Sequence, residues 1–105
     1  MSTTSSSLEN LVSQAPKLAE LSETLLFGDI WQRAELSPRE RSIATVSALL
    51  ALYRPAQLPF HLQRALDNGV SRAELGELIT HLAFYAGWPA AASAADALAF
   101  IPERK

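Results

Sequence analysis

Residues 37–54 read SPRERSIATVSALLALYR, and this stretch decides the fold class. Ser37 can accept hydrogen bonds from the free N–H groups of a helix start, Pro38 presets φ, and Glu40 completes a capping box. The apolar residues that follow share one helical stripe: Ile43, Val46, Leu50 and Tyr53. We predict a helix that begins after Ser37 and ends near Arg54, because the proline that follows disfavours helical geometry in the residue before it.

The same kinds of signal continue on both sides of this stretch. They are Pro16, Gly28-Asp29, Pro59, Asn68-Gly69, a second capping box at Ser71-Arg72-Ala73-Glu74, Gly87, Pro89 and Pro102. A short helix is also expected over residues 8–14. No alternating strand pattern interrupts the series, so the sequence predicts an all-α bundle of five to seven short helices. We expect a disordered segment over residues 1–7 and a single domain over 8–105.

Composition narrows the class of protein. Of the 105 residues, 49% are hydrophobic and only 19% are charged. So few charges leave two interpretations: a compact Ala-rich monomer, or an oligomer whose apolar surface is covered by another subunit. We favour the oligomer. The net charge of −2 argues against a nucleic-acid partner.

The N-terminus and the cysteine count limit the compartment and the chemistry. Residues 1–7 lack the basic and apolar regions of a signal peptide, and no apolar run is long enough to span a bilayer. We therefore expect a cytoplasmic protein without a membrane partner. The chain has no cysteine, so it has neither disulfides nor thiol nucleophiles.

Two histidines carry the acid–base potential of the chain. His61 is either a packed, structural histidine or a general acid or base. His81 follows Glu77 by four residues and precedes Tyr85 by four, which gives either a surface pair or a polar pocket wall. The spacing of the histidines has no metal-binding pattern, and the glycines form no phosphate loop, so neither a metal nor a cofactor is expected.

Read together, several segments resemble the carboxymuconolactone decarboxylase family. The ordered landmarks are Arg39-Glu40-Arg41-Ser42, Ala48-Leu49, Arg54-Pro55, His61-Leu62, Asn68-Gly69-Val70, Glu74 and Tyr85-Ala86-Gly87-Trp88-Pro89-Ala90. They span roughly residues 16–100, nearly the whole chain. The resemblance implies an alkylhydroperoxidase D-like α-fold that assembles as trimers or hexamers.

The redox branch of that superfamily uses an acidic residue, a C-x-x-C pair and a histidine four residues later. On this chain the pattern falls on Ser42, Arg54, Gln57 and His61, so only the histidine is retained. A dithiol cycle needs two thiols. Thiol peroxidase activity is therefore excluded for these 105 residues.

The decarboxylase branch does not need cysteine, and the resemblance implies roles for residues of this chain. His61 matches the family's histidine and is the candidate catalytic acid or base. Arg41 and Arg54 are candidate carboxylate anchors, because a guanidinium grips a carboxylate with two hydrogen bonds. The remaining candidate substrate contacts are Ser42, His81, Tyr85 and Trp88.

Three functions are thus compared. The first is decarboxylation or proton transfer on a small carboxylated lactone or related organic acid. The second is a non-catalytic oligomeric or ligand-binding module that keeps the fold. The third, helix-turn-helix binding of nucleic acid, is opposed by the acidic balance of the chain. We favour the first over the second.

Overall fold

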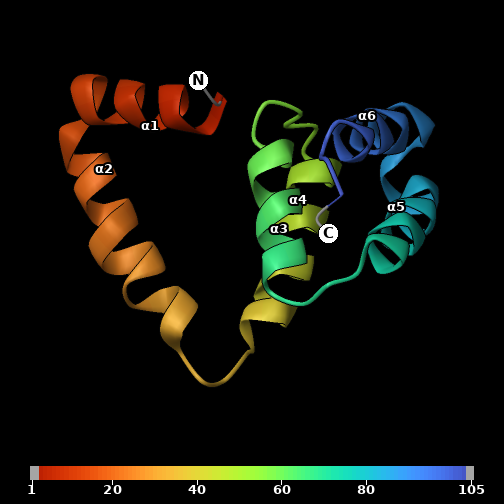
Figure 1. Ribbon diagram of the computed structural model, residues 1–105, viewed down its shortest axis with the longest axis horizontal. Coiled ribbons are helices and arrows are strands. Elements are labelled where there is room, and N and C mark those ends of the chain that lie inside the picture. Colours follow the sequence, from red (N-terminus) through yellow and green to blue (C-terminus); the bar gives the residue numbers. More distant parts are fainter. Residues whose placement is uncertain (1–2, 104–105) are drawn as a thin grey trace. The chain divides into compact units, whose positions relative to one another are not determined.

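A computed structural model describes residues 3–103 and contains six α-helices (Figure 1). They are α1 (Thr3–Gln14), α2 (Pro16–Leu21), α3 (Pro38–Ala51), α4 (Leu58–Asp67), α5 (Arg72–Ala86) and α6 (Trp88–Ala99). A π-helical turn, η1 (Ser22–Phe27), and a 3-10 turn, η2 (Ile30–Gln32), follow α2. No β-strand occurs within residues 3–103, so the predicted all-α fold of five to seven short helices is confirmed.

The chain divides into two compact units, Met1–Pro38 and Arg39–Lys105. Helix α1 begins at Thr3, so the structure assigns residues 3–7 to a helix where the sequence predicts a disordered segment. Residues 1–2 of that segment lie outside the described residues. Each unit has its own internal contacts. The expectation of one domain over residues 8–105 stays a prediction.

In the first unit, the predicted break after the second helix is confirmed. Pro16 is the first residue of α2, and the helical path continues through η1 to Phe27. A Cβ atom at Gly28 would lie 2.7 Å from the carbonyl oxygen of Glu23, so the close backbone approach there requires glycine. Beyond the break, the Trp31 ring stacks on Phe27, with ring centroids 5.9 Å apart.

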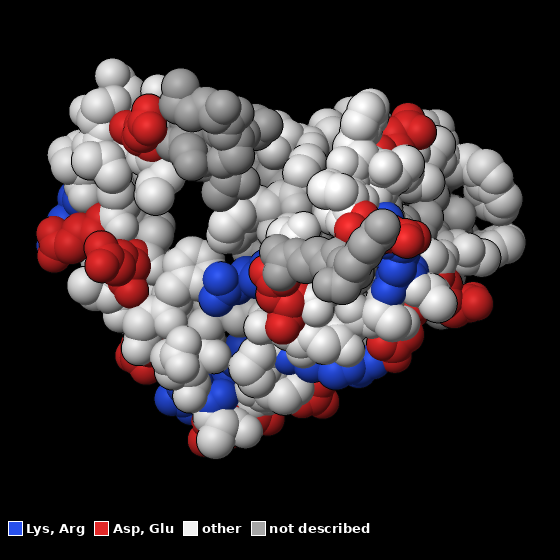
Figure 2. Space-filling model, viewed as in Figure 1, with Lys and Arg blue, Asp and Glu red and all other residues white. Residues whose placement is uncertain are grey.

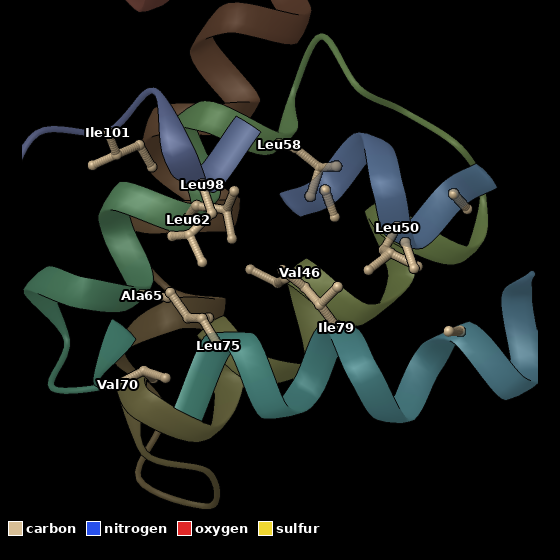
Figure 3. Close-up of a cluster of buried hydrophobic side chains, with 14 residues drawn as sticks. Val46, Leu50, Leu58, Leu62, Ala65, Val70, Leu75, Ile79, Leu98 and Ile101 are labelled. Atoms are coloured by element: carbon tan, nitrogen blue, oxygen red, sulfur yellow. The ribbon is translucent and has the colours of Figure 1, made fainter. Parts of the chain in front are cut away.

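In the second unit, helices α3 to α6 enclose one hydrophobic core. Figure 3 shows its labelled side chains directed into the space between these helices. The buried residues of the cluster are Val46, Leu50, Leu58, Leu62, Ala65, Val70, Leu75, Ile79, Ala83, Ala90, Ala91, Ala94, Leu98 and Ile101. Burial of each large aliphatic side chain contributes about 1.5–3 kcal/mol, which makes this cluster the main source of the unit's stability.

The start of α5 is fixed by the capping box that the sequence predicts. The Ser71 hydroxyl accepts a hydrogen bond from the Glu74 backbone N–H at 3.0 Å, and the Glu74 carboxylate accepts one from the Ser71 N–H at 2.9 Å. Arg72 then donates to the carbonyl oxygens of Leu98 and Ile101 at 2.9 and 2.6 Å. These two bonds join the start of α5 to the end of α6, so the two helices lie antiparallel.

The prediction that α3 ends near Arg54 is corrected by three residues, since the helix ends at Ala51. The Arg54 N–H donates to the Leu49 carbonyl at 2.8 Å and the Tyr53 N–H to the Leu50 carbonyl at 3.1 Å. This is the Schellman pattern, and it places Tyr53 in the left-handed region with φ of 55°. Tyrosine in this conformation costs about 1–2 kcal/mol relative to an ordinary helical residue.

Helix α4 also ends in a Schellman pattern, here with glycine, the residue that this pattern prefers in the left-handed position. The Val70 N–H donates to the Ala65 carbonyl at 2.9 Å, and Gly69 has φ of 97°. The left-handed glycine predicted at this position is therefore confirmed. The turn brings α5 back against α3 and α4, so that Leu75 enters the core.

The junction of α5 and α6 depends on Gly87. Its φ of 102° is one that side-chain-bearing residues rarely adopt, and Pro89 follows within the first turn of α6. The buried face of α6 consists largely of alanines, which allow α5 and α6 to approach closely. Within residues 3–103, no helix combines the length and the apolarity that crossing a bilayer requires.

Candidate functional site

All seven candidate site residues lie in the second unit, but on four different elements and a connecting segment. Arg41 and Ser42 are on α3, His61 is on α4, His81 and Tyr85 are on α5, Trp88 begins α6, and Arg54 lies between α3 and α4. Their contacts form separate groups. These groups are described in turn below. The catalytic and substrate-binding roles expected for the seven residues stay predictions.

His61 lies in the first turn of α4 and is half-buried. Pro59 sets the start of the helix, and the Phe60 ring packs edge-on against the imidazole with centroids 4.9 Å apart. The Nδ1 atom of His61 is buried. Burial, followed by the positive charge of Arg64, holds the pKa of this imidazole below its ordinary value of 6.5. A neutral ring at neutral pH is suited to take up and return a proton.

Arg64 is a functional candidate that the sequence analysis did not include among the site residues. It follows His61 by three residues on α4, it is half-buried, and its Nε atom is buried. Arg41 on α3 is also half-buried, with a buried Nε atom. The signal in the sequence was the helical spacing of His61 and Arg64, which places the two side chains on one face.

Arg54, a predicted carboxylate anchor, makes hydrogen bonds to the end of α3. Its guanidinium Nη1 donates to the carbonyl oxygens of Leu52 and Tyr53 at 3.1 and 3.5 Å. Leu52 and Tyr53 follow Ala51, the last residue of α3, so these bonds hold the turn that leads out of the helix. The geometry therefore gives Arg54 a structural task, and its role as an anchor stays a prediction.

Ser42 is fully buried, and its hydroxyl accepts a hydrogen bond from the Asn68 side-chain amide at 3.0 Å. The bond connects the first half of α3 to the residue that caps the end of α4. A buried hydroxyl needs such a partner, because leaving it without one costs about 1–3 kcal/mol. The contact accounts for Ser42 structurally and leaves its predicted substrate role untested.

His81 lines a cleft between α3 and α5 with a volume of about 380 Å³. Its walls are formed by Arg39, Ile43, Val70, Glu74, Glu77, Leu78 and His81. Arg39 forms an ion pair with Glu74. The backbone hydrogen bond from Ser71, and then Arg39, lower the pKa of the Glu74 carboxyl. The cleft thus has two carboxylates and one guanidinium, a balance that does not favour a carboxylate substrate.

Two aromatic pairs extend from this cleft along α5 into α6. The His81 and Tyr85 rings lie with centroids 5.0 Å apart, and Phe84 packs edge-on against Trp88 at 5.1 Å. The predicted stripe of His81 and Tyr85 is therefore present as a contact. Phe84, Tyr85 and Trp88 are 72%, 78% and 64% exposed, which is unusual for large aromatic side chains.

Within residues 3–103, no three side chains of histidine, aspartate or glutamate are grouped closely enough to hold a metal ion. The family assignment rests on comparison with known proteins. A sequence model of the carboxymuconolactone decarboxylase family matches residues 16–100. The chain belongs to this family. The resemblance seen in the ordered landmarks is confirmed.

Two curated proteins that are similar to this chain are named as decarboxylases. A 4-carboxymuconolactone decarboxylase of Acinetobacter baylyi is 40% identical over 88 residues, which cover 84% of this chain and 66% of the relative. A nitrosuccinic acid decarboxylase of Metarhizium robertsii is 33% identical over 70 residues, covering 67% of this chain and 49% of the relative. The chain therefore spans about two thirds of the length of one relative and half of the other.

In this carboxymuconolactone decarboxylase family member, the structure explains in part the residues at the four positions to which the sequence resemblance assigns the redox pattern. Ser42 accepts a hydrogen bond from Asn68, Arg54 donates to the turn that follows α3, and Gln57 precedes α4. The Gln57 carbonyl accepts the His61 N–H at 3.5 Å. His61 alone keeps a side chain that can transfer protons, so the acid–base chemistry of these four positions is concentrated there.

Proposed function

We propose that the chain is a decarboxylase that acts on a small carboxylated organic acid, with His61 as the proton donor. The observation that carries this proposal is a half-buried imidazole with the guanidinium of Arg64 three residues along the same helix, where burial, followed by the Arg64 charge, lowers the pKa of His61. Such a place attracts a carboxylate and contains a group that exchanges protons near neutral pH. The family and the names of both relatives support the same reaction type.

The substrate class follows from the chemistry of the reaction. Loss of CO₂ leaves an electron pair on carbon, and an adjacent electron-withdrawing group must delocalise it. A carboxymuconolactone supplies a lactone carbonyl, and a nitrosuccinic acid supplies a nitro group. The higher identity to the first relative supports a carboxylated lactone as the substrate of this chain.

The remaining residues are proposed to complete the site around His61. Arg41 is half-buried on α3 and is a candidate for carboxylate binding. His81 and Tyr85 are proposed to contact the body of the substrate, and Trp88 to lie at the rim of the site. No cofactor is proposed, because the lactone carbonyl itself takes up the negative charge. We place the protein in the cytoplasm, as the sequence predicts.

The non-catalytic alternative makes the opposite prediction in a turnover assay. Both relatives are named as decarboxylases, which does not favour a module without chemistry. The test is whether the purified chain releases CO₂ from 4-carboxymuconolactone or from nitrosuccinic acid. Release that depends on His61 supports the proposal, whereas binding of either acid without release of CO₂ contradicts it.

We further propose that the protein is a homo-oligomer, a trimer or a hexamer built from trimers. Phe84, Tyr85, Trp88 and Phe100 are between 64% and 87% exposed, and Figure 2 shows wide areas without charged side chains. Covering each such side chain contributes about 1.5–3 kcal/mol before the cost of association. Covering several of these rings in one interface therefore favours association.

Light scattering at low micromolar concentration tests the assembly. We expect a mass of three or six times the chain's 11.4 kDa. Trp88→Ala should shift the mass towards the monomer, because Trp88 is one of the exposed aromatic rings that the proposed interface covers. A mass of 11.4 kDa that does not change on concentration would contradict the oligomer.

A further inference from the structure

The positive charge that acts on His61 comes from its own helix. Arg64 follows it by three residues on α4, a spacing that places two side chains next to each other on one helical face. Both side chains are half-buried, and the His61 Nδ1 and Arg64 Nε atoms are buried. An imidazole and a guanidinium thus share one partly protected part of α4.

We propose that Arg64 binds the carboxylate that the substrate loses, and so holds the reacting carbon one helical turn from His61. The proposal rests on the decarboxylase function above. A guanidinium binds a carboxylate with two parallel hydrogen bonds, which fixes both position and orientation.

Binding at Arg64 changes the protonation of His61. In the free protein, burial and the Arg64 charge lower the pKa of the imidazole below 6.5. A bound carboxylate offsets the guanidinium charge and adds a negative charge nearby, so it favours the protonated ring. Substrate binding therefore transfers a proton from solvent to His61 before the reaction needs one.

The reaction then balances without a further reagent. The bond between the carboxylate carbon and its neighbour breaks, CO₂ leaves, and the electron pair moves into the electron-withdrawing group of the substrate. The imidazolium N–H of His61 gives its proton to the resulting carbanion. One proton is consumed for each CO₂ released. When the anion has left Arg64, the imidazole returns to its neutral form.

Nuclear magnetic resonance of the imidazole tests this coupling without turnover. The chain has two histidines, so His61→Gln identifies the His61 signal by its loss. The probe is succinate, a dicarboxylate that lacks the electron-withdrawing group, and the neutral diamide of succinate is its control. In the unaltered protein we expect the titration midpoint of His61 to lie below 6.5 and to rise with succinate but not with the diamide.

Substitutions at Arg64 should separate charge from structure. Arg64→Gln should raise the His61 midpoint in the free protein, remove the response to succinate and lower kcat/KM about 100-fold, as truncation of a buried charged partner does. Arg64→Lys keeps the charge and should keep the midpoint low and part of the response. Lys17→Gln removes the same charge from an exposed side chain in the first unit, so it should behave like the unaltered protein.

Two results would overturn the proposal. One is a His61 signal that does not respond to succinate in the unaltered protein, and the other is a response that persists in Arg64→Gln. If Arg64→Gln fails to fold by circular dichroism, a response to succinate that is as large in Arg64→Lys as in the unaltered protein would overturn the proposal. A protein that responds as described but releases no CO₂ from either acid would overturn the decarboxylase function and leave the carboxylate site in place.

Discussion

Replacing His61 by alanine is expected to lower kcat/KM for decarboxylation by about 10²–10⁴-fold, the usual contribution of a general acid. The helix content should stay the same, because the imidazole is only half-buried at the first turn of α4 and the core below it consists of other side chains. Steady-state kinetics with 4-carboxymuconolactone and far-ultraviolet circular dichroism give the two measurements.

Gln63→Ala is the matched control for this substitution. Gln63 lies on the same helix and donates a hydrogen bond to Asp67 at 3.1 Å, so its removal changes α4 without touching the imidazole. We expect kcat/KM of this variant to stay close to that of the unaltered protein. An unchanged kcat/KM in His61→Ala would refute the catalytic role, and a loss of helix content would instead favour a structural histidine.

Replacing Leu62 by alanine is expected to lower the free energy of unfolding by about 2–5 kcal/mol. Leu62 follows His61 on α4 and is fully buried in the core, where Figure 3 shows it beside Leu98 of α6. The shorter side chain leaves a cavity that its close-packed neighbours fill only in part. Denaturation with urea, followed by circular dichroism, measures the change.

The control for the core is Leu52→Ala at the end of α3. Leu52 is 63% exposed, so the same chemical change should alter the free energy of unfolding by no more than about 0.5 kcal/mol. Equal destabilisation by the two substitutions would contradict the position of the core. A small effect of Leu62→Ala alone would place that side chain outside it.

The helix boundaries of the second unit were largely predictable from the sequence because their signals are local. The capping box at Ser71 needs only residues within four positions, and the left-handed turn at Gly69 follows from glycine itself. For α3, the sequence predicts an end near Arg54, three residues beyond the observed end at Ala51. Tyr53 adopts a positive φ of 55°, which is rare for a residue with a large side chain. The residue types at this position therefore gave no sign of the turn.

The candidate site residues named from the sequence stay predictions, and the contacts that group them could not be predicted from the sequence. His61 stood out as one of two histidines, but the charge of Arg64 became meaningful only once α4 placed it beside the ring. The bond between Ser42 and Asn68 spans 26 positions in the sequence. It depends on the register between α3 and α4, which side-chain packing sets and which no local pattern encodes.

Release of CO₂ is the measurement that tests the central claim most directly. The purified chain is incubated in D₂O with 4-carboxymuconolactone labelled with ¹³C in its 4-carboxyl group, and nuclear magnetic resonance follows both products. The account predicts one labelled CO₂ for each product molecule, one deuterium bound to carbon in that product, and formation of both slowed by about 10²–10⁴-fold in His61→Ala. Absence of labelled CO₂ above the protein-free control, with nitrosuccinic acid also unchanged, would contradict it.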